Sequence, residues 1–229
     1  MKEIAIYVEG GGDKADQRSE LRNGFDRLLD KQKQSARRKG IGWKLVPSGG
    51  RDQAYSAFIH RFEQADPDAL VMLLVDSEGS LPPEKSKPAT ETTTAKKRRK
   101  LVDAQSRVKH LMNRDKHWTK LSDVPPLVVH LMVQCGEAWI AADTEEVEGF
   151  YGKGFLANRM PKTVNLESQT PHDLYDKLKK SSEKTKKGPY EKIEHASKLL
   201  AAIDASKVFM LCPRFATFTE WLDDQIASA

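Results

Sequence analysis

Short apolar runs alternate along this chain with segments in which apolar side chains recur every three or four residues. The apolar runs, which we expect to be β-strands, lie at residues 3–8, 41–47, 69–75, 125–133 and 208–211. The recurring pattern is typical of amphipathic helices and predicts them at about residues 14–38, 54–62, 96–113, 137–142, 171–180, 190–203 and 215–226. This alternation predicts an α/β fold, with a mostly parallel sheet flanked by helices and a helical C-terminal extension.

The length of 229 residues fits one large domain or two small ones. We expect residues 1–142 to form the α/β core, and residues 143–229 to form a mostly helical C-terminal part packed on the same core. Residues 77–95 are rich in Pro, Ser, Thr, Lys and Glu and show no hydrophobic period. A mobile basic loop is therefore expected over about residues 77–100.

Composition excludes several classes of protein. Two cysteines are too few for a disulfide scaffold or a Cys-rich zinc fold. No apolar run approaches the roughly 18 residues that a membrane helix needs, and the N-terminus MKEIAIYVEGGG lacks the apolar segment of a signal peptide. The sequence therefore predicts a soluble protein of the reducing cytoplasm with no membrane segment.

Charge is segregated along the chain. The formal net charge is +5, but residues 84–120 hold twelve basic and four acidic residues. Residues 177–192 hold seven basic and two acidic residues. The rest of the chain is therefore acidic. One interpretation is an acidic site beside basic segments that meet a polyanion. The other is that both basic segments are solvated surface.

Acidic residues stand at the ends of three expected strands. Glu9 follows the first strand, Asp76 and Glu78 follow the third, and Glu137 follows the fourth. In open α/β sheets, ligands bind outside the carboxyl ends of the strands, and converging carboxylates suit Mg²⁺ or Mn²⁺. The alternative is that each acid caps the helix that follows it.

Two of these strand ends carry a resemblance to a known family. IYVEGGGD resembles the first motif of the TOPRIM domain, found in topoisomerases, bacterial primases and OLD-type nucleases, with Glu9, Gly10 and Asp13 at the matching positions. LLVDSEG resembles the second motif, in which Asp76 matches the first acid. Glu78 stands where a second Asp is usual, which keeps the charge but lengthens the reach. The resemblance covers about residues 1–140 and implies a TOPRIM-like fold.

The whole chain also resembles small bacterial TOPRIM-like proteins that are often encoded beside an AAA or ABC-type ATPase. The similar segments are VEGGGD with RSELRNGFDRLL, then SGGRDQAYSAF, VDSEG, CGEAWIAAD and CPRFATF. Such pairs are associated with antiviral defence against phage. The resemblance therefore implies an ATPase partner.

The TOPRIM resemblance implies metal-dependent nuclease chemistry. Glu9 would be a metal ligand or general base, and Asp76 and Glu78 would hold Mg²⁺ or Mn²⁺, so these three are the candidate catalytic residues. Asp13 is a secondary metal-ligand candidate. Glu137 lies outside the motifs and is a candidate for a second metal. The three glycines after Glu9 let backbone N–H groups approach a phosphate, or simply form a tight turn.

Basic residues near the expected site are candidates for nucleic-acid binding. Arg51 follows the Ser-Gly-Gly turn, and Arg18 and Arg22 lie near the start of the first helix, where each could hold a phosphate. The run Lys96, Lys97, Arg98, Arg99 and Lys100 could follow a nucleic-acid backbone without sequence preference. Each could equally be exposed, or paired with nearby acids.

These observations favour a divalent-metal-dependent nuclease acting on DNA or tRNA, as the effector of an ATPase-linked defence system. Two other functions remain open. One is a non-catalytic regulatory subunit that binds an ATPase, and the other is a phosphohydrolase that acts on a small substrate with the same acids. The protein could also form a homo-oligomer.

Overall fold

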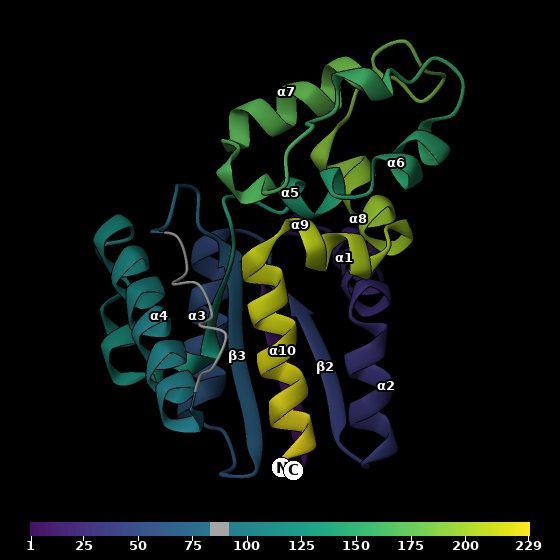
Figure 1. Ribbon diagram of the computed structural model, residues 1–229. Helices are drawn as coiled ribbons and strands as arrows, with labels where there is room; N and C mark the ends of the chain where they lie inside the picture. The colour runs from purple at the N-terminus through teal and green to yellow at the C-terminus, as the bar shows by residue number, and fades with distance from the viewer. Residues whose placement is uncertain (83–91) are drawn as a thin grey trace.

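A four-stranded parallel sheet forms the centre of the molecule (Figure 1). The computed structural model describes residues 1–82 and 92–229. Its strands are β1 (Glu3–Val8), β2 (Gly42–Pro47), β3 (Ala69–Asp76) and β4 (Val129–Met132), in the order β2-β1-β3-β4. Every neighbouring pair is parallel. The predicted α/β class, with a parallel sheet flanked by helices, is confirmed.

Strand β3 explains why the 69–75 run lacks an alternating pattern. It pairs with β1 on one side and with β4 on the other, and the residues from Val71 to Asp76 are all buried. A parallel strand covered on both faces needs apolar side chains in both directions. The continuous apolar run therefore marks the inner position of this strand in the sheet.

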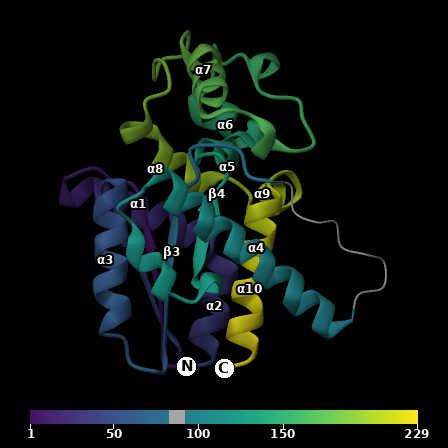
Figure 2. The same cartoon turned by 90° about the vertical axis from the view of Figure 1, so that its left-hand side faces the viewer.

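Helices cover both faces of the sheet (Figure 2). Helix α3 (Arg51–Glu63) packs on one face against β1 and β3. The opposite face is covered by α1 (Ala15–Leu28), α2 (Asp30–Arg38) and α10 (Pro213–Ala227), and α4 (Thr93–Arg114) lies beside β4. None of the helices in the described part of the chain is long and apolar enough to cross a membrane.

The remaining helices lie over the carboxyl ends of the strands (Figure 1). They are α5 (Glu137–Ala141), α6 (Thr144–Tyr151), α7 (Pro171–Ser182), α8 (Lys192–Ala202) and α9 (Ala205–Leu211), with 3-10 turns at Ala157–Arg159 and Leu166–Ser168. Two further 3-10 turns, at Thr119–Asp123 and Pro126–Val128, lie between α4 and the start of β4. Helix α8 packs closely on α1, where a Cβ atom at Gly24 would lie 2.6 Å from the Ser197 carbonyl oxygen. This packing joins the C-terminal helices to the sheet layer.

The strand order creates a crevice at the carboxyl edge of the sheet. From β1 the chain crosses to β2 on one side, and from β3 it crosses to β4 on the other, although β1 and β3 are direct neighbours. The connections therefore leave the ends of β1 and β3 in opposite directions. Such a switch point is where open α/β sheets bind their ligands, and Glu9 and Asp76 stand at it.

The predicted strand at residues 208–211 is wrong, because these residues belong to helix α9. The Asp204 side chain caps this helix by accepting a hydrogen bond from the Ser206 N–H at 2.8 Å. Val208 is buried, whereas Phe209 and Met210 are exposed. Four apolar residues are too few to reveal a helical period, so composition alone suggested a strand.

The segments 14–38 and 125–133 also differ from expectation. The predicted single helix is divided at Leu29, although the Leu29 N–H still donates to the Phe25 carbonyl at 2.9 Å, and both Leu28 and Leu29 are buried. In the second segment, the consecutive prolines lead into a 3-10 turn, so only Val129–Met132 pairs as a strand. Helix α6 was not predicted.

The basic loop expected over residues 77–100 is only partly described. Residues 83–91 lie outside the described residues. Residues 93–100 form the first two turns of α4 rather than a loop, and Thr92 caps this helix by accepting a hydrogen bond from the Ala95 N–H. The basic run Lys96–Lys100 is therefore presented on a helix.

Candidate functional site

Three of the predicted acids meet at the carboxyl edge of the sheet. Glu9 comes directly after β1, Asp76 ends β3, and Glu78 lies two residues further on. One carboxylate oxygen from each residue lies within 4.8 Å of the others. The strand ends thus bring together the three residues that the two sequence motifs singled out.

Glu9 is held by two donors. Its Oε2 accepts hydrogen bonds from Arg51 Nη1 at 3.1 Å and from the Asp76 backbone N–H at 3.3 Å. Burial raises the pKa of Glu9, and the positive charge of Arg51 partly opposes that shift. The side chain is therefore an oriented carboxylate with more than ordinary basicity.

Asp76 is the most deeply buried of the three acids, at 4 % exposure. Its Oδ1 accepts a hydrogen bond from the Gly136 N–H at 2.9 Å, and its Oδ2 lies 3.4 Å from Lys192 Nζ. Burial raises the pKa of Asp76 to about 7, and the nearby carboxylates of Glu9 and Glu137 act in the same direction. Lys192 opposes the shift. The group therefore titrates close to neutral pH.

Glu78 occupies a backbone conformation that is uncommon for residues other than glycine, with φ at +54°. Its N–H donates a hydrogen bond to the Gln134 carbonyl at 2.8 Å, which fixes the turn after β3. The side chain is exposed but still reaches the oxygens of Glu9 and Asp76. The longer side chain of Glu in place of Asp therefore does not remove this residue from the cluster.

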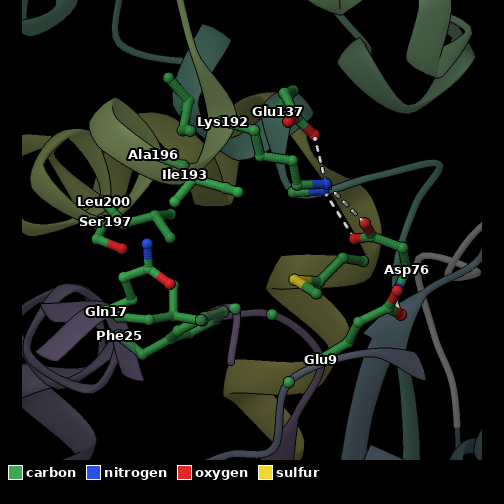
Figure 3. Close-up of a pocket in the computed structure, with 18 of the residues that line it drawn as sticks. Glu9, Gln17, Phe25, Asp76, Glu137, Lys192, Ile193, Ala196, Ser197 and Leu200 are labelled. Carbon is green, nitrogen blue, oxygen red and sulfur yellow. Dashed lines mark hydrogen bonds and ion pairs between the residues drawn. The ribbon is translucent and has the colours of Figure 1, made fainter. Parts of the chain in front are cut away.

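The two other candidate metal ligands lie outside this cluster. Glu137 is buried at the start of α5, where it accepts a hydrogen bond from Tyr190 Oη at 3.1 Å and lies 3.5 Å from Lys192 Nζ. Lys192 thus stands between Glu137 and Asp76 (Figure 3). Asp13 is exposed in the turn before α1.

Arg51 is engaged by protein groups rather than presented to solvent. Its guanidinium donates to Glu9, to the Asp76 carbonyl at 2.5 Å and to Asp115 Oδ2 at 2.7 Å, and it lies 4.9 Å from the Trp118 ring centre. The side chain is 13 % exposed. It joins the ends of β1 and β3 to the end of α4, so its observed contacts are those of a positioning residue for the acids.

The other basic candidates lie further from the acids. Arg22 donates a hydrogen bond to the Leu45 carbonyl at 3.0 Å, and the Arg18 backbone lies against Gly11. Lys100 forms an ion pair with Asp224 at 2.8 Å, and Lys96 lies 4.0 Å from the same carboxylate. Lys97 and Arg98 are exposed, and Arg99 is half-buried.

The position of the basic run on α4 separates it from the acidic cluster. His110 on the same helix contacts the Ser77 carbonyl at 2.9 Å, beside Asp76. Residues 96–100 precede His110 by ten to fourteen positions, which places them roughly 15–20 Å away along the helix axis. Any nucleic acid on the basic run would therefore lie beyond the immediate surroundings of the acids.

A cavity of about 300 Å³ opens beside Glu9 and Asp76 (Figure 3). The Glu9–Gly12 turn and the Gly49–Gly50 turn line one part, and these turns are held together by hydrogen bonds between Gly10 and Gly49. Helices α1 and α8 line another part with apolar side chains. Lys192 and the α8 wall were not among the predicted site residues, although Lys192 ends the second basic stretch.

The raised pKa of Asp76 predicts a pH dependence of stability. Between about pH 4 and pH 7 the folded protein holds a proton on Asp76 that the unfolded chain has released, so stability should fall as pH rises through this window. The expected loss is on the order of 4 kcal/mol, at about 1.4 kcal/mol per pKa unit. Urea unfolding in EDTA from pH 4.5 to 8.5 measures it. An Asp76→Asn variant with the same pH profile as the wild type would contradict the assignment.

The comparison with protein families concerns almost the whole chain. The family described as "Domain of unknown function (DUF4276)" matches residues 8–223. No curated protein and no solved structure matches the chain. The matched range contains the three clustered acids, Arg51, Lys192 and the helices that line the cavity. The chain therefore belongs to the DUF4276 family.

Proposed function

We propose that this protein is a divalent-metal-dependent nuclease that hydrolyses phosphodiester bonds in DNA or tRNA. The observation that carries the proposal is the convergence of Glu9, Asp76 and Glu78 at the switch point of the sheet, beside a cavity. Nothing in the packing of a core requires three carboxylates at one place. The resemblance of both strand ends to TOPRIM motifs supports the same function.

The donor set fits Mg²⁺ or Mn²⁺. All three side chains supply carboxylate oxygens, which hard divalent cations prefer. Two ligands of one Mg²⁺ stand at most about 4.2 Å apart, so a cluster within 4.8 Å needs only a small side-chain adjustment. Glu9, Asp76 and Glu78 would hold the ion, which would polarise the phosphodiester and make a water molecule a better nucleophile.

The protein groups around the acids suit the same reaction. Glu9, whose pKa is raised by burial, can accept a proton from the attacking water. The glycine turn after it adopts positive φ angles of +88° at Gly11 and +58° at Gly12, which lets the backbone approach a phosphate closely. The Lys192 ammonium at the cavity wall supplies a positive charge for the phosphate oxygens.

A second candidate function is a non-catalytic subunit that binds an AAA or ABC-type ATPase. The observation that favours it is that protein cations already neutralise the acids. Arg51 pairs with Glu9, and Lys192 lies within 3.4 Å of Asp76. In this alternative the acids serve to connect α3 and α8 to the strand ends rather than to bind a metal. The role in antiviral defence likewise rests on the resemblance.

Cleavage assays distinguish the two functions. The purified protein is incubated with plasmid, single-stranded DNA and total tRNA in Mg²⁺, Mn²⁺ or EDTA, alone and with the neighbouring ATPase. We expect metal-dependent cutting that Glu9→Gln reduces at least about 10²-fold, a typical contribution of a general base. Glu20→Gln, at an exposed position of α1, is the matched control and should cut normally. No cutting under any condition would favour the non-catalytic subunit.

A further inference from the structure

The cavity beside the acids has two chemically different halves. On one side lie Glu9 and Asp76, with Lys192 above them (Figure 3). The opposite side is an apolar chamber between α1 and α8, and its wall is formed by Leu21, Phe25, Ile140, Ile193, Ala196 and Leu200. Phosphodiester hydrolysis at the acids requires no such chamber. Its presence indicates that the ligand also carries an apolar group.

The chamber is preformed and built on rigid elements. Phe25 is 2 % exposed and Leu200 4 % exposed, so both are fixed by the packing of α1 against α8. That packing includes the close approach of Gly24 to the Ser197 backbone, which leaves α8 little freedom to move inward. The whole cavity, with its acidic and apolar halves together, has a volume of about 300 Å³, which is that of a small-ligand pocket.

Two polar side chains in the chamber indicate what kind of ligand group it can bind. The side chains of Gln17 and Ser197 lie on the apolar side of the cavity, away from the acids (Figure 3). A wall of apolar side chains with hydrogen-bonding groups at one end is an environment in which proteins hold an unstacked nucleobase. A simple hydrocarbon group would offer neither polar side chain a hydrogen-bonding partner.

We propose that this chamber receives one unpaired nucleobase of the nucleic acid whose phosphate lies at Glu9 and Asp76. The proposal rests on the proposed nuclease function and specifies its substrate class as single-stranded nucleic acid or a nucleotide extruded from a duplex. A base paired and stacked in a duplex cannot enter a chamber enclosed between two helices without leaving the stack. The protein should therefore bind single strands more tightly than duplexes.

The test fills the chamber without changing any acid. Ala196→Trp places a large side chain in the chamber, and Ala196→Leu is a milder filling that is easier to accommodate. Val164→Trp is the matched control, because it adds the same side chain at a position that is 88 % exposed. Circular dichroism and Mn²⁺ titration by calorimetry check that the fold and the acid cluster are intact in each variant.

Binding is measured with an oligonucleotide that carries 2-aminopurine, both single-stranded and in a duplex, with Ca²⁺ replacing Mg²⁺ to limit cleavage. We expect wild type and Val164→Trp to bind the single strand about tenfold more tightly than the duplex, because a duplex must first unpair and unstack the base. The 2-aminopurine fluorescence should change on binding. Ala196→Trp should lose the preference and the fluorescence change, and Ala196→Leu should weaken both.

Other outcomes separate this inference from the nuclease proposal. Equal binding of single strand and duplex, with no effect of the Ala196 variants, would overturn the nucleobase chamber even if Glu9-dependent cleavage is observed. AMP is tested as a third probe beside the two oligonucleotides. Binding of AMP but of neither oligonucleotide would overturn both proposals and identify a small-substrate site. Binding of neither probe by a correctly folded wild-type protein would also overturn both.

Discussion

Asp76→Asn is expected to abolish the proposed Mn²⁺-dependent and Mg²⁺-dependent cleavage while leaving the protein folded. Asp76 is the most deeply buried acid of the cluster, and the amide that replaces it is a weak, uncharged ligand. Charge stabilisation by a metal ion is worth several kcal/mol, so we expect a loss of about three orders of magnitude in rate, at about 1.4 kcal/mol per tenfold change. Calorimetric titration with Mn²⁺ should show a matching loss of affinity.

The same substitution should stabilise the metal-free protein at pH 8. Above its pKa of about 7, Asp76 is a buried charge, and burial is the largest cause of its raised pKa. The neutral amide removes this penalty and can still accept the Gly136 hydrogen bond. Urea unfolding in EDTA measures the difference, with Asp66→Asn at an exposed position as the control. A variant that cleaves normally, or that is less stable than wild type at pH 8, would contradict the role given to Asp76.

Asp103→Ala is expected to produce the largest loss of stability outside the site. The guanidinium groups of Arg107 and Arg214 are both buried, and both donate to the Asp103 carboxylate. Arg107 also donates to the Val129 carbonyl at 2.8 Å, and Arg214 donates to the Pro82 carbonyl at 2.9 Å. This network connects α4, β4 and the start of α10. Removing the carboxylate takes one negatively charged acceptor away from two buried guanidinium groups.

We expect Asp103→Ala to lower the free energy of unfolding by about 3–5 kcal/mol, as measured when one partner of a buried ion pair is removed. Urea denaturation checks this value. Asp223→Ala is the control, because its ion pair with Lys31 lies at the surface and should contribute at most about 1 kcal/mol. A loss for Asp103→Ala no larger than that of the control would show that other groups compensate the two arginines.

The acidic cluster and the buried arginine network have opposite consequences for stability. At the cluster, three carboxylates are held close together, and the raised pKa values of Glu9 and Asp76 show that burial disfavours their ionised forms. In the network, one carboxylate connects two cations. The first arrangement is compatible with the proposed cation site, in which the ion would add to the positive charge of Arg51 and Lys192. In the second, the two arginines already compensate the carboxylate.

Local patterns were sufficient to locate most elements and the principal acids. The run at 69–75 predicted a strand covered on both faces, and β3 confirms it. Because parallel strands end at one edge, the positions of Glu9 and Asp76 after their strands already predicted that they would meet. Local patterns failed at residues 208–211, because four apolar residues are too few to show a period. These residues belong to a helix that begins after its capping residue Asp204.

The sequence by itself thus determined the α/β class, the parallel sheet and the acids at its carboxyl edge, because these follow from periodicity and from motifs within a few residues. Only the tertiary structure decided which distant groups surround those acids. Lys192 reaches Asp76 across 116 positions, Arg51 reaches Asp115 across 64, and α8 forms one wall of the cavity. Periodicity shows which side chains are buried but not which partners they meet, since the strand order and the docking of helices set those contacts.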